Sequence, residues 1–555
     1  VDRRSSGVCR IIKLSQERTK ELLAIHGWSG IILGLLLYAV ICTGTIAVFS
    51  TEIGDWSNPL DGPATEGLPP NINALVQELG DQVDPAYRDQ FFLYSSGGGR
   101  LMLQFEGHLE QDGDDDHPGA EEHYGVLYEI DPNTLTLLNR TEGPEAMLDA
   151  ARRATDALAD FFVDLHVRLH IPNPWGLYVT GVLGLIMMVA AITGFLVHRH
   201  LIRELFTIRR NKEALLRSRD AHVIAGTWTL PFAFVLAFTG SFFSFATSLG
   251  LPAMAMVVFG GDQERAIAEV FGEPPATDET PAPVANFDAV IADATARTGA
   301  RPNFIAGSFY GRADSQMRAF TPAEEGDLTG RSPVYSGVTG EFLYDKPVLV
   351  GQSPSAGNAV AALMAPLHFG NFAGIVSKAV WFALGFAGAY VALTGMLLWT
   401  NRRADQRAWQ RMGRIVHWMG YGLPLTMAMT PYGTFAGRWF GWPLETAQWT
   451  AFGLAALAAL IVALGARTAA RARDLLVATT GFALLGVPLV RYATGGPGWL
   501  GAWSDGLMTV IAGDLIMMLG GVICLGLWRF GAGTSAEQAG QANSRPGRSN
   551  PQVTA

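Results

Sequence analysis

Long apolar runs constrain this sequence more than any other feature. A helix needs about 20 apolar residues to cross a hydrocarbon core of about 30 Å. Eight segments approach or exceed that length, at about 26–50, 174–198, 222–249, 370–399, 415–431, 443–465, 475–491 and 506–528. Soluble cores seldom need such runs. The sequence therefore predicts an α-helical integral membrane protein with about eight transmembrane helices.

The distribution of charge predicts the orientation of these helices. Lys and Arg gather at both ends and in three connecting segments: six in 1–25, seven in 199–221, five in 401–416, three in 467–474 and three from 529 onwards. The two long segments between them are acidic, with 24 Asp and Glu against five Lys and Arg in 51–165, and 14 against seven in 251–367. We therefore expect both termini in the cytoplasm and both acidic segments outside. The first apolar run is longer than a signal-peptide core, so we expect it to be retained.

The two acidic segments share one order of predicted elements. In each, a Pro-rich linker precedes a helical pattern, at 71–80 and 287–299, and strand-like runs follow. This predicts two small α+β outer domains that arose by duplication. The full organisation expected is a basic tail 1–25, helix 26–50, outer domain 51–165, helix 166–198, inner loop 199–221, helix 222–249, outer domain 250–367, helix 368–400, inner loop 401–414, a four-helix extension 415–528 and a disordered tail 529–555.

Four histidines recur at fixed distances from a Thr-Gly pair. His26 precedes Thr43-Gly44 by the same interval as His222 precedes Thr239-Gly240. His166 precedes Thr193-Gly194, and His368 precedes Thr394-Gly395, at longer intervals that differ by a single position. The copies are offset by about 200 residues, and such self-similarity indicates a helix-loop-helix unit repeated twice in roughly the first 400 residues.

The histidines fall at two predicted depths. Topology places His26 and His222 near the inner face and His166 and His368 near the outer face. An ionisable side chain in a membrane helix is costly unless it has a function or a partner. Two imidazoles at one depth can supply both axial ligands of one haem, which suits electron transfer because no iron position stays open. We therefore predict two haems per chain, one above the other.

Other assignments of the histidines stay open. Each one could be an interfacial side chain that hydrogen-bonds to a neighbour. His170 follows His166 by one helical turn and is the rival outer ligand. His198 is the rival inner ligand, whereas His417 is interpreted as structural.

Small residues on these helices are expected to make room for a flat cofactor, namely Gly27, Gly30, Gly34, Gly181, Gly184, Gly226, Gly370 and Gly374. The Thr-Gly pairs are interpreted as general packing features, in which Thr bonds back to its own helix and Gly permits close contact.

Residues 108–124 hold His108, His117 and His123 among seven Asp and Glu. We interpret this segment as a solvated acidic loop, because it lacks a fixed ligand spacing; ligation of a divalent cation is the alternative.

Several stretches resemble the PepSY-associated transmembrane family, which includes bacterial inner-membrane ferric-siderophore reductases. They are HGWSG (26–30), DLHVRL (164–169), DAHVIAGTWTLPFAFVLAFTG (220–240), PLHFGNFAG (366–374) and the PepSY-like VYSGVTGEFL (334–343). The resemblance covers roughly residues 20–403. It implies two b-type haems held by His26, His166, His222 and His368, with electrons passing to a periplasmic acceptor. The sequence departs from the family at Ala221, where the motif usually has Leu, and in its four C-terminal spans.

Together these features predict a haem-containing oxidoreductase of the bacterial inner membrane that reduces a ferric siderophore or another Fe(III) chelate. No Gly-x-Gly-x-x-Gly motif is flanked by a strand and a helix, so electrons are expected from quinol or a cytoplasmic reductase. The alternative is a non-enzymatic PepSY membrane anchor that binds or restrains a periplasmic partner. A metal transporter fits least, because spans 1 to 4 lack acidic groups at mid-membrane. No nucleic-acid partner is expected.

Overall fold

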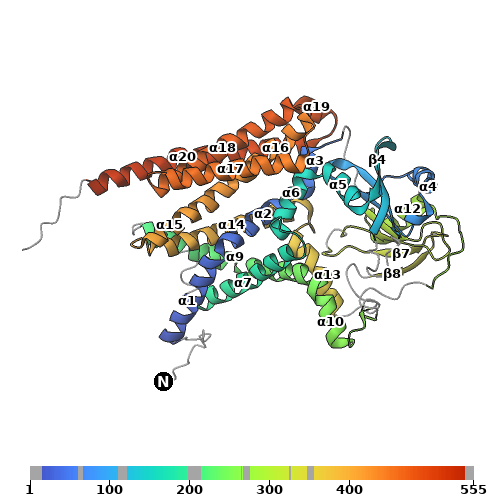
Figure 1. Cartoon of the computed structure of the whole chain (residues 1–555), viewed down its shortest axis with the longest axis horizontal. Coiled ribbons are helices and arrows are strands. Elements are labelled where there is room, and N and C mark those ends of the chain that lie inside the picture. Colours follow the sequence, from blue (N-terminus) through green and yellow to red (C-terminus); the bar gives the residue numbers. More distant parts are fainter. Residues whose placement is uncertain are drawn as a thin grey trace, which may run out of the picture. The chain divides into compact units, whose positions relative to one another are not determined.

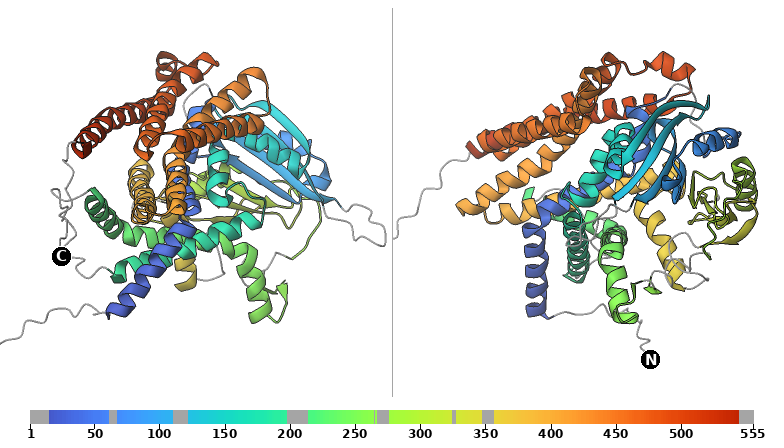
Figure 2. Two further views of the ribbon diagram at one scale, coloured as in Figure 1. Left: turned by 60° about the vertical axis from the view of Figure 1, so that its left-hand side comes forward. Right: turned by 45° about the vertical axis from the view of Figure 1, so that its right-hand side comes forward.

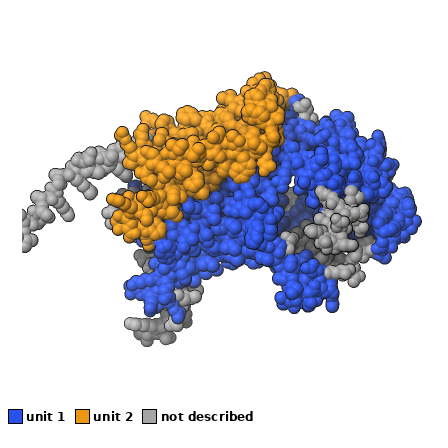
Figure 3. Space-filling model, in the orientation of Figure 1, with its two compact units in different colours: residues 1–399, 505–507 blue, residues 400–504, 508–555 orange. Residues whose placement is uncertain are grey.

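The chain was analysed as a computed structural model that describes residues 15–60, 67–109, 122–197, 214–263, 265–266, 276–323, 327–346 and 356–543. It divides into two compact units, residues 1–399 with 505–507 and residues 400–504 with 508–555 (Figure 3). Helices dominate both units, and the first also carries a sheet (Figure 1).

Within the described residues, six helices are long and apolar enough to cross a bilayer. They are α7 (Trp175–Val197), α9 (Ala214–Phe245), α14 (Gly374–Asn401), α17 (Leu444–Gly465), α18 (Ala469–Ala493) and α20 (Met508–Asn543). A further pair, α1 (Gln16–Ile32) and α2 (Gly34–Ala47), meets at a bend of 68° and adds a seventh span if it makes one crossing. The chain is therefore a multi-pass membrane protein.

The expected count of eight spans is not reached. The segment predicted at 415–431 is divided among α15 (Arg407–His417), a π-helical turn η4 (Trp418–Gly422) and α16 (Leu423–Phe440). α16 has 18 residues, but three buried threonines and Arg438 make it more polar than the six helices above. By length and composition, the described residues support six or seven spans, and the eighth is not confirmed.

Two predicted helix boundaries were also wrong. His166 and His368 do not begin spans 2 and 4; they lie in the last turns of separate helices, α6 (Ala157–Arg168) and α13 (Ala356–Phe369). After α6, Leu169 and His170 both have φ of 53°, and after α13, Gly370 has φ of 65°. Left-handed residues commonly end helices. The apolar runs expected at about 174–198 and 370–399 agree with α7 and α14, and only the wider bounds that began at the histidines joined two helices into one.

The strands of both acidic segments join in one antiparallel sheet of order β4-β3-β2-β1-β5-β6-β7-β8. The first module supplies β1 (Gln90–Ser95), β2 (Leu101–Leu109), β3 (Glu122–Asp131) and β4 (Thr136–Pro144), and the second supplies β5 (Phe304–Ser308), β6 (Gln316–Phe320), β7 (Pro333–Ser336) and β8 (Phe342–Asp345). The first strands of the two modules pair from Gln90↔Ser308 to Tyr94↔Phe304. Figure 2 shows the two sets of strands in blue and olive. The duplicated modules thus share a sheet, whereas two separate domains were expected.

The two modules also share a core and exchange helix caps. Phe91, Phe105 and Phe287 are fully buried in one cluster that draws on both modules. Helices α4 (Asn73–Asp81) and α12 (Phe287–Thr298) begin side by side: the Asp288 carboxylate accepts the N–H of Ile72 at 2.8 Å, and Asn73 Oδ1 accepts the N–H of Phe287 at 2.9 Å. Each helix start therefore satisfies donors of the other, which fixes the two modules as one body.

The second unit is held at one end by a buried ion pair. Arg491 on α18 donates to both carboxylate oxygens of Asp514 on α20, at 3.0 and 2.7 Å, and their side chains are 3% and 1% exposed. Trp499, at the start of α19 (Trp499–Ser504), donates its indole N–H to the same carboxylate at 2.8 Å. Both charges are thus hydrogen-bonded, as buried charges in an apolar bundle must be.

Candidate functional site

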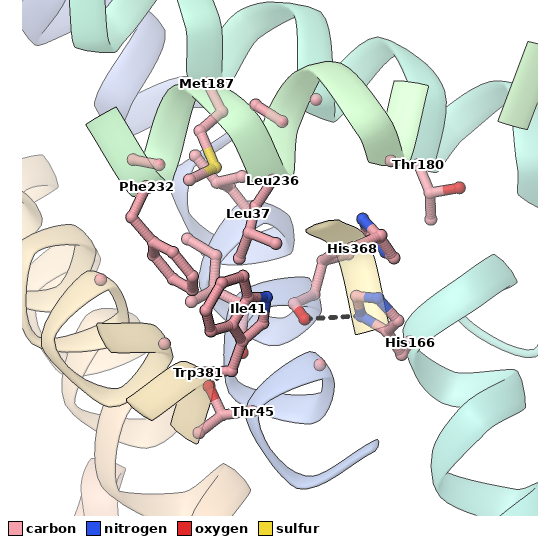
Figure 4. Close-up of a pocket in the computed structure, with 18 of the residues that line it drawn as sticks. Leu37, Ile41, Thr45, His166, Thr180, Met187, Phe232, Leu236, His368 and Trp381 are labelled. Carbon is pink, nitrogen blue, oxygen red and sulfur yellow. Dashed lines mark hydrogen bonds between the residues drawn. The ribbon is translucent and has the colours of Figure 1, made fainter. Parts of the chain in front are cut away.

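Two pairs of histidines face each other inside the first unit. The ring centres of His26 on α1 and His222 on α9 are 6.4 Å apart, and we call these residues the inner pair. The ring centres of His166 on α6 and His368 on α13 are 6.0 Å apart, and these form the outer pair. Figure 4 shows the two outer rings side by side, each carried by a different helix. The structure thus brings together the residues of both predicted pairs, one from each repeat.

These separations suit two ligands of one metal ion. A bond of about 2.0–2.1 Å from a metal to each imidazole nitrogen, plus about 1.1 Å from that nitrogen to its ring centre, gives about 6.2–6.4 Å between rings. The inner pair at 6.4 Å lies in this range, and the outer pair at 6.0 Å lies just below it. Across the described part of the chain, no group of three or more His, Cys, Asp or Glu is placed to hold a metal. The iron of a porphyrin takes two axial ligands from the protein, which is the number that each pair offers.

Each of the four rings uses its Nδ1 for a contact with another helix. His26 Nδ1 lies 3.0 Å from the carbonyl of Ala190, His166 Nδ1 2.9 Å from that of Val40, His222 Nδ1 3.1 Å from that of Val391, and His368 Nδ1 2.9 Å from the hydroxyl of Thr239. The dashed line in Figure 4 marks the bond of His166. A carbonyl only accepts, so in three rings Nδ1 carries the proton, and Nε2 keeps the lone pair that a metal requires.

All four Nδ1 contacts are made at a Thr-Gly pair or one helical turn before it. The carbonyls of Val40, Ala190 and Val391 each belong to the residue three positions before the Thr of such a pair. A Cβ placed on Gly44, Gly194, Gly240 or Gly395 would lie 2.6, 3.2, 3.2 or 3.1 Å from Cε1 of His166, His26, His368 or His222, respectively. The threonines also bond back to their own helices, as expected. The contacts between these glycines and the rings were not foreseen, although the constant spacing was their signal.

A cavity of about 180 Å³ adjoins the outer pair. Its wall is largely apolar, and Figure 4 shows Leu37, Ile41, Met187, Phe232, Leu236 and Trp381 on one side of the two rings. Apolar pockets with a few convergent polar groups are typical sites for organic cofactors. The residues present therefore fit a flat, apolar group that the two imidazoles hold from opposite sides.

The four histidines lie within the part of the chain that comparison with known proteins identifies. The model of the family described as PepSY-associated TM region matches residues 23–402. The chain belongs to this family. Among relatives, the uncharacterized protein PA4219 of Pseudomonas aeruginosa is 25% identical over 332 residues, which cover 54% of this chain and 79% of that protein. The family match ends near the start of the second unit, whose helices lie beyond it.

The rival ligands occupy other surroundings in this family member. His170 lies beyond the end of α6, where its ring packs 4.6 Å from that of Phe161. It is His166 that faces His368. His417, in the second unit, contacts the carbonyl of Gly413 on its own helix through Nδ1 at 2.7 Å. His198 lies outside the described residues.

Most of the glycines expected to make room for a cofactor face other side chains instead. A Cβ on Gly27, Gly34, Gly181 or Gly370 would meet Trp399, Met396, Phe245 or Trp381, respectively. Gly184 alone of the eight lines the described cavity, as do Gly44 and Gly240 of the Thr-Gly pairs. The sequence identified small residues on the right helices but could not tell which helix face each one occupies.

The acidic segment 108–124 falls largely outside the described residues, and His117 with it. Its ends continue the sheet, where His108 and His123 are opposite each other in β2 and β3. The interpretation as a solvated loop stays a prediction.

Carboxyl groups gather on α3 (Ser50–Ser57) and α6, which are not among the membrane-spanning helices. Burial, and after it the repulsion from the nearby carboxylates of Asp156 and Asp164, raises the pKa of Asp160 to about 7. Glu52 on α3 accepts from Lys378 on α14 through both oxygens, at 2.7 and 2.8 Å. This ion pair links the first repeat to the second.

Proposed function

We propose that this protein is a haem-containing membrane oxidoreductase, in which the inner pair and the outer pair each hold one haem b. The two facing pairs of imidazoles, each at the separation of axial ligands, support this most strongly. An interfacial histidine needs only one hydrogen-bond partner to be satisfied. Here each histidine already has a partner for its Nδ1, and hydrogen bonding alone therefore does not account for a second histidine opposite it. This arrangement occurs in both pairs.

When bound, haem b accepts and releases one electron at a time, and two imidazoles per iron leave no open coordination position. The residues of this chain supply the remaining requirements. Apolar side chains from α2, α7, α9 and α14 keep water away from the outer pair. On α9 the inner ligand His222 precedes Gly240, the neighbour of the outer ligand His368, by about five helical turns. The two pairs therefore lie at two levels and define an order for electrons across the membrane.

The charge distribution supports a direction and a class of acceptor. The acidic segments carry formal charges of 5 − 24 = −19 in 51–165 and 7 − 14 = −7 in 251–367, or −26 together. Such a field favours the approach of cationic or neutral molecules, mainly at low salt. We infer that electrons pass from a quinol or a cytoplasmic reductase, through the inner pair and then the outer pair, to an Fe(III) chelate of the siderophore type. The protein then lies in the bacterial inner membrane with both termini in the cytoplasm.

Haem content tests the cofactor. Pyridine haemochrome quantitation of the purified protein should give two haems per chain. His26→Ala and His222→Ala should remove one spectral component, and His166→Ala and His368→Ala the other. His417→Ala is the control and should keep both. One haem per chain would reject the proposal as stated, and a colourless protein would favour the role of a PepSY anchor that binds or restrains a partner.

Reoxidation tests the acceptor. A neutral or cationic Fe(III) hydroxamate should reoxidise the dithionite-reduced protein faster than a strongly anionic Fe(III) complex, and the gap should narrow as salt rises. His166→Ala and His368→Ala should slow this reaction even where the inner haem remains. A rate that is indifferent to the outer pair would refute the proposed electron path.

A further inference from the structure

We infer that each Thr-Gly pair is a positioning element for the histidine of the neighbouring helix. The glycine leaves space for the edge of the ring, and a helix carbonyl or the Thr hydroxyl holds Nδ1. This inference rests on the proposed haem ligation and goes beyond it, because it assigns a role to residues outside the ligand set.

Within each repeat, the glycine that follows an inner histidine contacts an outer histidine, and the glycine that follows an outer histidine contacts an inner one. In the first repeat, Gly44 contacts His166 of the outer pair, whereas His26 on the same span belongs to the inner pair and contacts Gly194. In the second repeat, Gly240 contacts His368 and Gly395 contacts His222 in the same way. α9 therefore gives a ligand to the inner pair and a positioning element to the outer pair, as α1 and α2 do together. α6 with α7, and α13 with α14, give a ligand to the outer pair and a positioning element to the inner pair. The stretch from His222 to Thr239 lies within the single helix α9 and rises about 25 Å, which is the step from one level to the other.

General helix packing does not account for this arrangement. Other glycines on the same helices meet a variety of side chains: Gly27 meets Trp399, Gly34 meets Met396 and Gly181 meets Phe245. The glycines of all four Thr-Gly pairs meet an imidazole, and each time the nearest atom is Cε1, which lies between the two ring nitrogens. Among these glycines, contact with a histidine ring is thus specific to those of the Thr-Gly pairs.

The four threonines differ in their distance from the rings. Thr193 lies 3.4 Å from Nδ1 of His26 and also donates to the Ala190 carbonyl, the main partner of that ring. The hydroxyl oxygens of Thr239 and Thr394 lie 2.9 and 3.1 Å from the Nδ1 atoms of His368 and His222. Both hydroxyls donate to carbonyls of their own helices, so their oxygens are free to accept from Nδ1–H. Thr43 differs, because its hydroxyl bonds to the carbonyls of Ala39 and Val40, and the Val40 carbonyl is the partner of His166.

This difference has an electronic consequence. A hydrogen bond accepted from Nδ1–H makes an imidazole a stronger donor to its metal, which favours the oxidised iron. Thr239→Val keeps the shape of the side chain and removes this acceptor from His368. We therefore expect the reduction potential of the outer haem to become more positive in this variant, with the inner haem unchanged. Thr394→Val should shift the inner haem alone and by less, because His222 keeps the Val391 carbonyl at 3.1 Å.

The test is a spectroelectrochemical titration of the purified haem-loaded variants, with components assigned through the histidine variants. Thr43→Val is the matched control and should shift the outer haem less than Thr239→Val does. Thr239→Ser retains a hydroxyl and should restore the wild-type potential. Equal shifts in Thr43→Val and Thr239→Val, a shift of the inner component in Thr239→Val, or a Thr239→Ser variant that behaves like Thr239→Val would overturn the inference. Fewer than two haems in the wild-type protein would instead reject the proposed function.

Discussion

Replacement of Gly44 by Ala should remove the outer haem and spare the inner one. The new Cβ would lie 2.6 Å from Cε1 of His166, whereas ordinary van der Waals contact begins at 3.4 Å. The ring must therefore move by about 3.4 − 2.6 = 0.8 Å, or α2 and α6 must separate by a similar distance. A ligand site tolerates a misplacement of only about 0.5 Å. His166 would also lose its 2.9 Å contact with the Val40 carbonyl.

The other three glycines provide a graded series. The corresponding distance is 3.1 Å at Gly395 and 3.2 Å at both Gly194 and Gly240, which is only slightly closer than the 3.4 Å of ordinary contact. These shortfalls lie within the tolerance of about 0.5 Å, so the Ala variants should keep two haems and show altered spectra of the contacted component. The order of severity follows from the distances alone.

The assay is haem quantitation with absorption spectra of the reduced and oxidised protein. Gly30→Ala is the control, because it lies on the same span and a Cβ there meets nothing within 4 Å. Gly44→Ala should contain one haem per chain, with the spectrum of the His166→Ala variant. Loss of the inner component, although Gly44 shares a span with His26, would refute the crossed arrangement. A wild-type spectrum in Gly44→Ala would refute the steric argument.

Three further predictions follow from other contacts. The outer rings are nearly parallel, at 27°, so electron paramagnetic resonance of the oxidised protein should show a rhombic low-spin signal that His368→Ala removes. The inner rings are inclined at 67°, so a second, more axial signal should disappear in His222→Ala. Asp514→Ala should lower the free energy of unfolding of the second unit by about 3–5 kcal/mol in denaturant titrations, because the charge of Arg491 is left buried without its counter-ion. The double variant Arg491→Met/Asp514→Leu removes both charges and should come close to the stability of the wild type. Burial raises the pKa of Asp160 from 3.8 to about 7, so its contribution to stability is complete below about pH 4 and is lost as the pH rises to about 7. Asp160→Asn should therefore flatten the fall in Tm over that range. An unchanged pH profile of Tm would contradict the assigned pKa.

The sequence alone determined the class of protein, the repeat and the composition of the histidine pairs. Apolar length, charge asymmetry and the recurrence of a His at a constant interval before Thr-Gly are properties of the chain read in one dimension. Because a helix rises by a fixed amount per residue, such spacing converts directly into depth. It could therefore predict that His26 belongs with His222 and that His166 belongs with His368.

Only the tertiary structure decided which faces meet. The separate helices α6 and α13, the pairing of β1 with β5 and the contact of Gly44 with His166 depend on neighbours that are distant in sequence. A Thr-Gly pair has the same local pattern whether its glycine faces a tryptophan, lipid or an imidazole. The rotation of each helix about its axis settles that choice, and packing against other helices sets this rotation.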